Sequence, residues 1–153
     1  APLFAHVDGW QWTPNLIWCD NLGVYGTPNY YVQQLFGLHR GDTVLPVAVN
    51  DDRPPAQRLH VSASRSDHPR QIIVRVVNPV GTAVEASVEV SGVKSVSSPA
   101  KLIVLAGASL QDENSLDEPK RVAPVESKLE VAGPQFRHHF APRSLSVLRL
   151  DLF

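Results

Sequence analysis

The chain has 153 residues, with 14 lysines and arginines against 15 aspartates and glutamates and a formal net charge of −1 at pH 7. This balance, without a long block of one sign, gives no cationic field for a nucleic acid or an acidic membrane, so we expect neither partner. The apolar runs, such as KLIVLAG, fall far short of the roughly 20 residues of a membrane span. The length fits one domain, or a compact domain plus a piece of another.

Aromatic residues are distributed unevenly along the chain. All three tryptophans and all three tyrosines lie between Trp10 and Tyr31, and after Gly41 only Phe136, Phe140 and Phe153 remain. Because aromatic side chains carry much of the contact area in cores and pockets, this indicates two kinds of structure joined near Gly41. The chain also lacks methionine, including at position 1, so we expect a C-terminal fragment or a processed product.

Cysteine and histidine give no metal signature. Cys19 is the only cysteine, which excludes an internal disulfide and a cysteine-rich metal site. His138 and His139 are adjacent, and on a strand their side chains would point to opposite faces, so solvated strand positions are favoured over metal ligands. We expect no metal and no cofactor.

From Gly41 onward the sequence alternates with period two and carries frequent turn signals. In TAVEASVEV, Thr82 to Val90 place threonine, alanine and valine on one face and glutamate on the other, as in a half-buried antiparallel strand. This pattern predicts a β-sandwich, jelly-roll-like, over residues 41–153, with seven or eight strands and no helix. Further strands are expected at 58–64, 71–78, 100–105, 127–131, 136–140 and 144–152.

One long irregular stretch, AGASLQDENSLDEPKR, interrupts these strands. Its acidic and amide content raises the alternative of a calcium site, but the stretch lacks the ligand register of an EF-hand loop. A plain surface loop is the favoured interpretation.

Before Gly41 the pattern is different. In YGTPNYYVQQLFGLHRG, Thr27 is a candidate N-cap, Pro28 a candidate first helical residue, and Gly37 or Gly41 a candidate end. The apolar PLFAHV predicts a short strand, and an aromatic loop follows it. A strand, a loop and a helix in this order form the βα unit of an α/β barrel, whose loop belongs to the active-site face.

Longer motifs resemble a known family. WQWTPNLIWCDN, YGTPNYYVQQLF, DENSLDEPKRVAPVE and FAPRSLSVLRLDL resemble, in this order, the C-terminal part of the α-L-arabinofuranosidases of glycoside hydrolase family 51. The resemblance implies that residues 1–40 are the last strand, loop and helix of an incomplete (β/α)8 barrel and that 41–153 are an accessory sandwich. The missing upstream barrel is then a partner of this chain.

The resemblance also implies a reaction. Such enzymes are exo-acting and release terminal arabinofuranosyl units from arabinan, arabinoxylan or arabino-oligosaccharides with retention, which needs two carboxyl groups about 5 Å apart. The family's two glutamates lie upstream of Ala1, and no acidic residue here stands in a matching motif, so we expect no catalytic residue in this chain and no activity from it alone. An extracellular or periplasmic parent protein is favoured.

Candidate sugar-binding residues lie in the aromatic loop. Trp10 and Trp12 can receive the C–H face of a sugar ring, and Asn15, where the family often has aspartate, can bond its hydroxyls. The alternative is that these tryptophans pack the barrel against the sandwich. For Asp20 a turn hydrogen bond is favoured over catalysis.

Two other interpretations stay open. The sandwich could be a free-standing carbohydrate-binding or assembly module, although it has no Trp or Tyr after Tyr31. It could also be a purely structural domain. If residues 1–40 belong to a barrel, the isolated chain should expose an apolar patch and could form a homo-oligomer. The expected patch residues are Leu3, Phe4, Val7, Leu16, Ile17, Trp18, Leu35 and Phe36.

Overall fold

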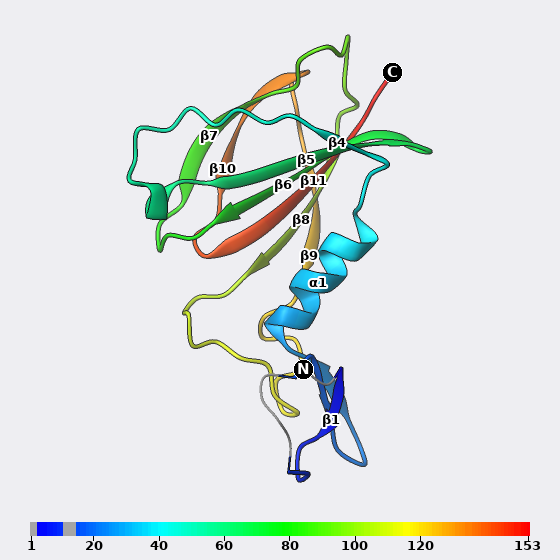
Figure 1. Ribbon diagram of the computed structural model, residues 1–153, viewed down its shortest axis with the longest axis vertical. Coiled ribbons are helices and arrows are strands. Elements are labelled where there is room, and N and C mark those ends of the chain that lie inside the picture. The colour runs from blue at the N-terminus through cyan, green and yellow to red at the C-terminus, as the bar shows by residue number, and fades with distance from the viewer. Residues whose placement is uncertain (1–2, 11–14) are drawn as a thin grey trace.

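The computed structural model describes residues 3–10 and 15–153, which form short N-terminal strands, one α-helix and a β-sandwich. Figure 1 shows the N-terminal strands at one end, the helix in the middle and the sandwich at the other end. Before the sandwich come β1 (Phe4–His6), β2 (Ile17–Cys19), β3 (Val24–Gly26) and α1 (Pro28–Leu38). The sandwich contains β4 (Thr43–Leu45), a 3-10 turn (Pro55–Gln57), β5 (His60–Asp67), β6 (Arg70–Asn78), β7 (Val84–Glu89), β8 (Ala100–Ala106), β9 (Val125–Leu129), β10 (Gln135–Phe140) and β11 (Ser144–Asp151).

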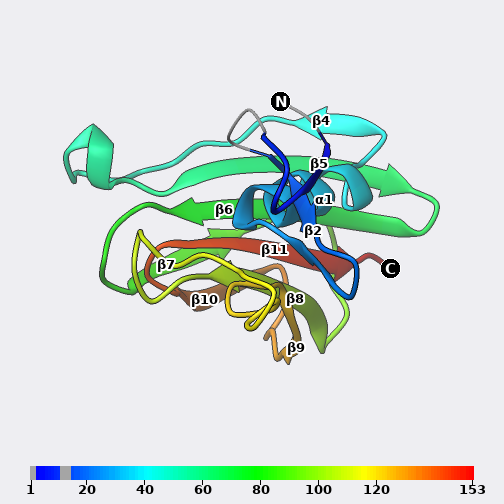
Figure 2. The same cartoon turned by 90° about the horizontal axis from the view of Figure 1, so that it is seen from below.

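The sandwich consists of two antiparallel sheets of unequal size. The larger sheet has the order β4-β5-β6-β11-β8-β9, and Figure 2 shows these strands following one another from top to bottom. The smaller sheet pairs β10 with β7. Phe136 and Phe140 of β10 pack against Val74, Leu102 and Leu148 of the larger sheet in one buried cluster. The predicted C-terminal antiparallel β-sandwich is therefore confirmed as the fold class, and its bounds at 41–153 stay a prediction.

A second apolar cluster lies on the opposite face of the larger sheet. There Leu35 of α1 is buried against Ile73, Ile103 and Val147. Successive side chains of a strand point to opposite faces, so a strand covered on both sides is apolar at nearly every position. This explains the run IIVRVV in β6, where six consecutive residues from Gln71 to Val76 are buried.

The helix begins where the sequence predicts. Thr27 is the N-cap, its hydroxyl accepts a hydrogen bond from the Tyr30 amide at 3.3 Å, and Pro28 is the first helical residue. Neither candidate glycine ends the helix: Gly37 lies inside it, and the C-cap is His39, whose amide still donates to the Leu35 carbonyl.

The N-terminal segment contains more strand than the single one expected. β1 pairs in parallel with β2, and β2 pairs antiparallel with β3. The connection predicted to be entirely loop thus holds two additional three-residue strands. That these elements belong to a barrel stays a prediction.

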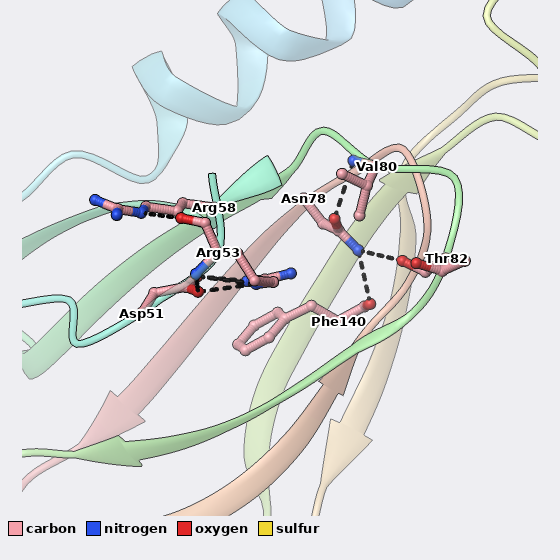
Figure 3. A network of polar contacts seen from close by, with 7 residues as sticks. All are labelled: Asp51, Arg53, Arg58, Asn78, Val80, Thr82 and Phe140. Carbon is pink, nitrogen blue, oxygen red and sulfur yellow. Dashed lines mark hydrogen bonds and ion pairs between the residues drawn. The ribbon is translucent and has the colours of Figure 1, made fainter. Parts of the chain in front are cut away.

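The buried side-chain amide of Asn78 forms hydrogen bonds to two turns of the sandwich. Asn78, 1% exposed, donates from Nδ2 to the Thr82, Phe140 and Ala141 carbonyls at 2.8–3.1 Å, and its Oδ1 accepts from the Val80 amide. Figure 3 shows most of these contacts. Because the acceptors come from both the β6–β7 and β10–β11 turns, Asn78 fixes the two sheets relative to each other.

The same view shows a polar network in the segment before β5. Arg53 forms a bidentate ion pair with Asp51, with nitrogen to oxygen distances of 2.6–3.1 Å. Arg58 donates a hydrogen bond to the Arg53 carbonyl at 2.6 Å. The side-chain and backbone bonds from Arg53 lower the pKa of Asp51 to about 2. This network gives the segment a defined path without regular structure.

Candidate functional site

Two of the three predicted sugar-binding residues, Trp10 and Asn15, differ in exposure. Trp10 is 95% exposed, whereas Asn15 is 2% exposed, although both lie on the connection between β1 and β2. Trp12 lies outside the described residues. The structure therefore gives the exposed aromatic group and the amide different environments within one connection.

Asn15 is a buried polar side chain. Within residues 3–10 and 15–153 neither its Oδ1 nor its Nδ2 has a hydrogen-bond partner, while its backbone carbonyl accepts from the Thr27 hydroxyl at 3.3 Å. Leaving a buried polar group unpaired costs about 1–3 kcal/mol. Asn15 can thus offer one acceptor and two donors to a group from outside this chain.

The turn after β2 is built by Asp20. Its Oδ1 accepts from the Leu22 and Gly23 amides at 2.8 and 2.6 Å, and these bonds hold the pKa of Asp20 below its ordinary value. The predicted turn hydrogen bond at Asp20 is confirmed. Its carboxylate is engaged in shaping the turn that leads into β3.

The long acidic loop is more than a surface connection. Asn114, 5% exposed, donates to the Gly26 carbonyl at 2.8 Å and exchanges two bonds with the Val122 backbone at 2.9 and 2.7 Å. This amide ties the loop to the end of β3, 88 residues earlier in the chain. Most residues of the loop are exposed, which fits the favoured surface loop, and Asn114 in addition anchors it to the N-terminal segment.

The same loop closes one side of a shallow cavity of about 240 Å³. Its lining combines apolar and tyrosine side chains with a lysine: Ile17, Val24, Tyr25, Gly26, Tyr30, Tyr31, Pro119 and Lys120. Burial, and to a smaller extent the charge of Glu113, raises the pKa of Tyr25. Sequence reasoning missed this cavity because its walls come from distant segments.

The helix end is joined to the sandwich through Arg75 of β6. Its guanidinium donates to the His39 carbonyl and, at 3.3 Å, to the Ser64 hydroxyl, and it lies 5.5 Å from the centre of the Phe36 ring. Arg75 is 8% exposed, and its burial lowers the pKa of the guanidinium, which stays charged in proteins. Gly41 approaches the same place closely, since an added Cβ would lie 2.6 Å from the Arg65 carbonyl oxygen.

Comparison with known proteins now identifies the chain. The sequence profile of the α-L-arabinofuranosidase C-terminal domain matches residues 1–144. The chain belongs to this family. The resemblance to glycoside hydrolase family 51 is confirmed.

Relatives of this arabinofuranosidase C-terminal domain are much longer proteins. This chain is 34% identical over 150 residues to a probable α-L-arabinofuranosidase A of Aspergillus oryzae. The alignment covers 97% of this chain and 22% of the relative. The chain is 31% identical to α-L-arabinofuranosidase 2 of Arabidopsis thaliana, covering 86% and 19%. The chain therefore spans about a fifth of the length of the curated relatives it matches.

A solved structure shares the fold of the arabinofuranosidase C-terminal domain over its whole length. The arabinose-bound MgGH51 α-L-arabinofuranosidase superposes with a TM-score of 0.89 at 28% identity, covering 100% of this chain and 24% of the other. The Thermotoga maritima enzyme, at 22% identity and a TM-score of 0.79, shows the same fold.

The outer face of the smaller sheet of the arabinofuranosidase C-terminal domain is charged. Glu85 forms an ion pair with Arg137 at 3.3 Å and lies 3.1 Å from His139 Nε2, while His138, half-buried, packs edge-on against Phe140. The adjacent histidines thus point to opposite faces, as predicted. Within residues 3–10 and 15–153, no group of three His, Cys, Asp or Glu side chains is arranged to hold a metal ion. No helix among them could span a membrane.

Proposed function

We propose that this chain is the C-terminal part of a retaining, exo-acting α-L-arabinofuranosidase that releases terminal arabinofuranosyl residues from arabinan, arabinoxylan or arabino-oligosaccharides. The observation that carries the proposal is the family match over residues 1–144, which the fold similarity along the whole chain supports. The two catalytic carboxylates of this proposal come from the chain upstream of Ala1.

The distribution of carboxylates supports inactivity of this chain alone. Asp8 and Asp20 are the only acidic residues before Asp42, and the Asp20 carboxylate accepts two backbone hydrogen bonds. A retaining glycosidase needs an acid/base and a nucleophile about 5 Å apart. The N-terminal segment has neither a third carboxylate nor an unengaged pair to offer.

Residues 1–40 are proposed to belong to the catalytic barrel. β1 pairs with β2 in parallel, as barrel strands do, whereas β2 pairs antiparallel with β3. The exposed apolar side chains of Leu3, Phe4 and Phe36 give further support, since a barrel would cover them. One residue of the expected patch is placed differently: Leu35 is 4% exposed and packs under the helix against the sandwich.

In this setting, Trp10 or Trp12 lines the entrance to the sugar site and Asn15 hydrogen-bonds the bound arabinose. The exposure of Trp10 and the unpaired amide of Asn15 support these roles. The alternative, a free-standing carbohydrate-binding or assembly module, has less support: the sandwich has no Trp or Tyr to stack on a sugar ring, and its smaller sheet presents charged side chains outward.

An assay with p-nitrophenyl α-L-arabinofuranoside tests the proposal. We expect no turnover by this chain and turnover by the longer protein that carries it. In that protein, Trp10→Ala should raise KM and leave kcat nearly unchanged, because a platform contacts ground state and transition state alike. Turnover by this chain alone would contradict the upstream position of the carboxylates, and an inactive longer protein would contradict the enzyme function.

A further inference from the structure

Three cationic residues form one row across three neighbouring strands. The register places Arg149 of β11 opposite Lys101 of β8, and Lys101 opposite Lys128 of β9. The row lies on the face of the larger sheet that α1 covers, because Ile103, two residues from Lys101, belongs to the cluster around Leu35. Like charges directly opposite each other destabilise a sheet. The row therefore needs an explanation.

Compensation within the chain is incomplete. Glu126 pairs with Lys101 at 2.7 Å, and the neutral Gln71 accepts from Arg149 through Oε1 at 2.7 and 3.0 Å while donating to Asp151. Lys128 has no ion pair within the part of the chain that the structure describes, and it is exposed. Two carboxylates thus accompany three cations, and the outermost cation is the unpaired one.

The end of α1 does not account for the row. A helix C-terminus attracts cations, but here the His39 carbonyl is already served by Arg75. The pKa of the His39 side chain is lowered, chiefly by burial. The positive charges of Arg149 and Lys101 lower it further. The charge of Glu126 acts against them and raises this pKa.

A cavity of about 370 Å³ lies beside the two lysines. Besides Lys101 and Lys128 it is lined by Pro99, Ala100, Glu126 and Ser127. It is shallow and open to solvent, so a sugar ring bound there would lie against it with one face exposed. The lysines suit a carboxylate, the Glu126 carboxylate can accept from hydroxyl groups, and the exposed Pro99 offers an apolar surface to ring C–H groups.

We propose that the β8–β9 cavity binds a uronic-acid unit of a polysaccharide, with its carboxylate between Lys101 and Lys128. The inference rests on the proposed function, because it takes the ligand from the same class of carbohydrate polymer. The net charge of −1 for the whole chain favours a single carboxylate-bearing unit over a long polyanion. The site would hold a charged unit of the polymer while a neutral arabinofuranosyl unit is processed elsewhere.

Titration of this chain with a galacturonic acid trisaccharide, followed by NMR amide shifts, tests the proposal. We expect shifts centred on Lys101, Glu126 and Lys128, and affinity that falls as salt rises, since exposed charges are screened. A neutral arabino-oligosaccharide of equal length should leave these amides unchanged. An absence of shifts at millimolar trisaccharide would overturn the proposal.

Charge reversal at Lys128 gives a sharper test. Lys128→Glu should weaken trisaccharide binding about tenfold or more, while the matched change Lys94→Glu, at an exposed position outside the row, should leave binding unchanged. Lys128→Glu also replaces a like-charge pair by an opposite one, so it should raise the urea midpoint of unfolding. Loss of binding together with gained stability would separate ligand loss from misfolding.

Two further outcomes would overturn the proposal. Unchanged binding by Lys128→Glu would remove Lys128 from the site, and equal binding of a glutamate tripeptide would show that the cavity recognises carboxylates without the sugar. Failure here is distinguishable from failure of the enzyme function, because turnover of p-nitrophenyl arabinofuranoside by the longer protein involves no uronic acid.

Discussion

Replacing Gly41 by alanine tests the close contact at the junction of helix and sandwich. The added Cβ would lie 2.6 Å from the Arg65 carbonyl oxygen and 2.7 Å from the Ser64 Cβ, well inside ordinary contact distance. Since the first neighbour is backbone, rotation of a side chain cannot relieve the clash. Overpacking of this kind costs about 1–3 kcal/mol. Ser64 also accepts a bond from Arg75, so its displacement would loosen that contact as well.

Gly37, four residues earlier and inside α1, provides the matched control. An added Cβ there meets nothing within 4 Å. Gly37→Ala should therefore stabilise the fold by about 0.5–1 kcal/mol, because alanine is the better helix former. Urea unfolding followed by circular dichroism measures both variants, and we expect opposite shifts of the midpoint with unchanged slopes. A Gly41→Ala protein as stable as the original would refute the steric argument.

Three further variants probe the contacts that join the two parts. Arg75→Met should lower the free energy of unfolding by about 2 kcal/mol, because it removes the hydrogen bond to His39 and the contact with Phe36. The control Arg65→Met changes an exposed side chain and should alter this free energy by less than about 0.5 kcal/mol. Equal effects of the two variants would contradict the role of Arg75 in joining the helix to the sandwich. Asn114→Ala should cost about 1–3 kcal/mol and speed hydrogen exchange of the Val122 amide, which bonds its side chain; unchanged exchange would contradict the anchor. Burial lowers the pKa of His39 from 6.5, so the unfolded chain binds more protons. The contribution of His39 to the free energy of unfolding is complete above pH 6.5 and is lost as the pH falls below that value. His39→Asn should therefore flatten the decline of this free energy between roughly pH 7 and 5. An unaltered slope would show that His39 does not cause the decline.

Much of the sandwich could be predicted from sequence because most of its longer strands carry their own signal, although β5, expected at 58–64, lies at His60–Asp67. β6, β8, β10 and β11 match the expected ranges within one residue at each end, since alternation and turn residues act locally. The edge strand β9 was expected at 127–131 and lies at Val125–Leu129, because four of its five residues are exposed and no alternation marks its bounds. Short strands such as β2 and β4 give too few residues for a period to be recognised.

The contacts that define the candidate sites could not be predicted, because they depend on pairing between distant segments. The cation row requires the registers of β8, β9 and β11, which no single segment contains. Asn114 meets Gly26 across 88 residues. For Asn15 the sequence suggested an amide facing a ligand, and its burial depends on how β1 and β2 pair. In each case the sequence gives the residue type, but it does not give the residues that lie next to it in the folded chain.

The second apolar cluster has a consequence for moving this sandwich between enzymes. Composition divides the chain near Gly41, but Leu35 fills the space above Ile73, Ile103 and Val147. A transplanted segment that starts after the helix would expose Ile73, Ile103 and Val147 to water. The free-energy cost would be about 25 cal/mol for each Å² of apolar surface exposed. The exchangeable module therefore begins at Thr27, and a chimera built at that point should fold where one built at Gly41 aggregates.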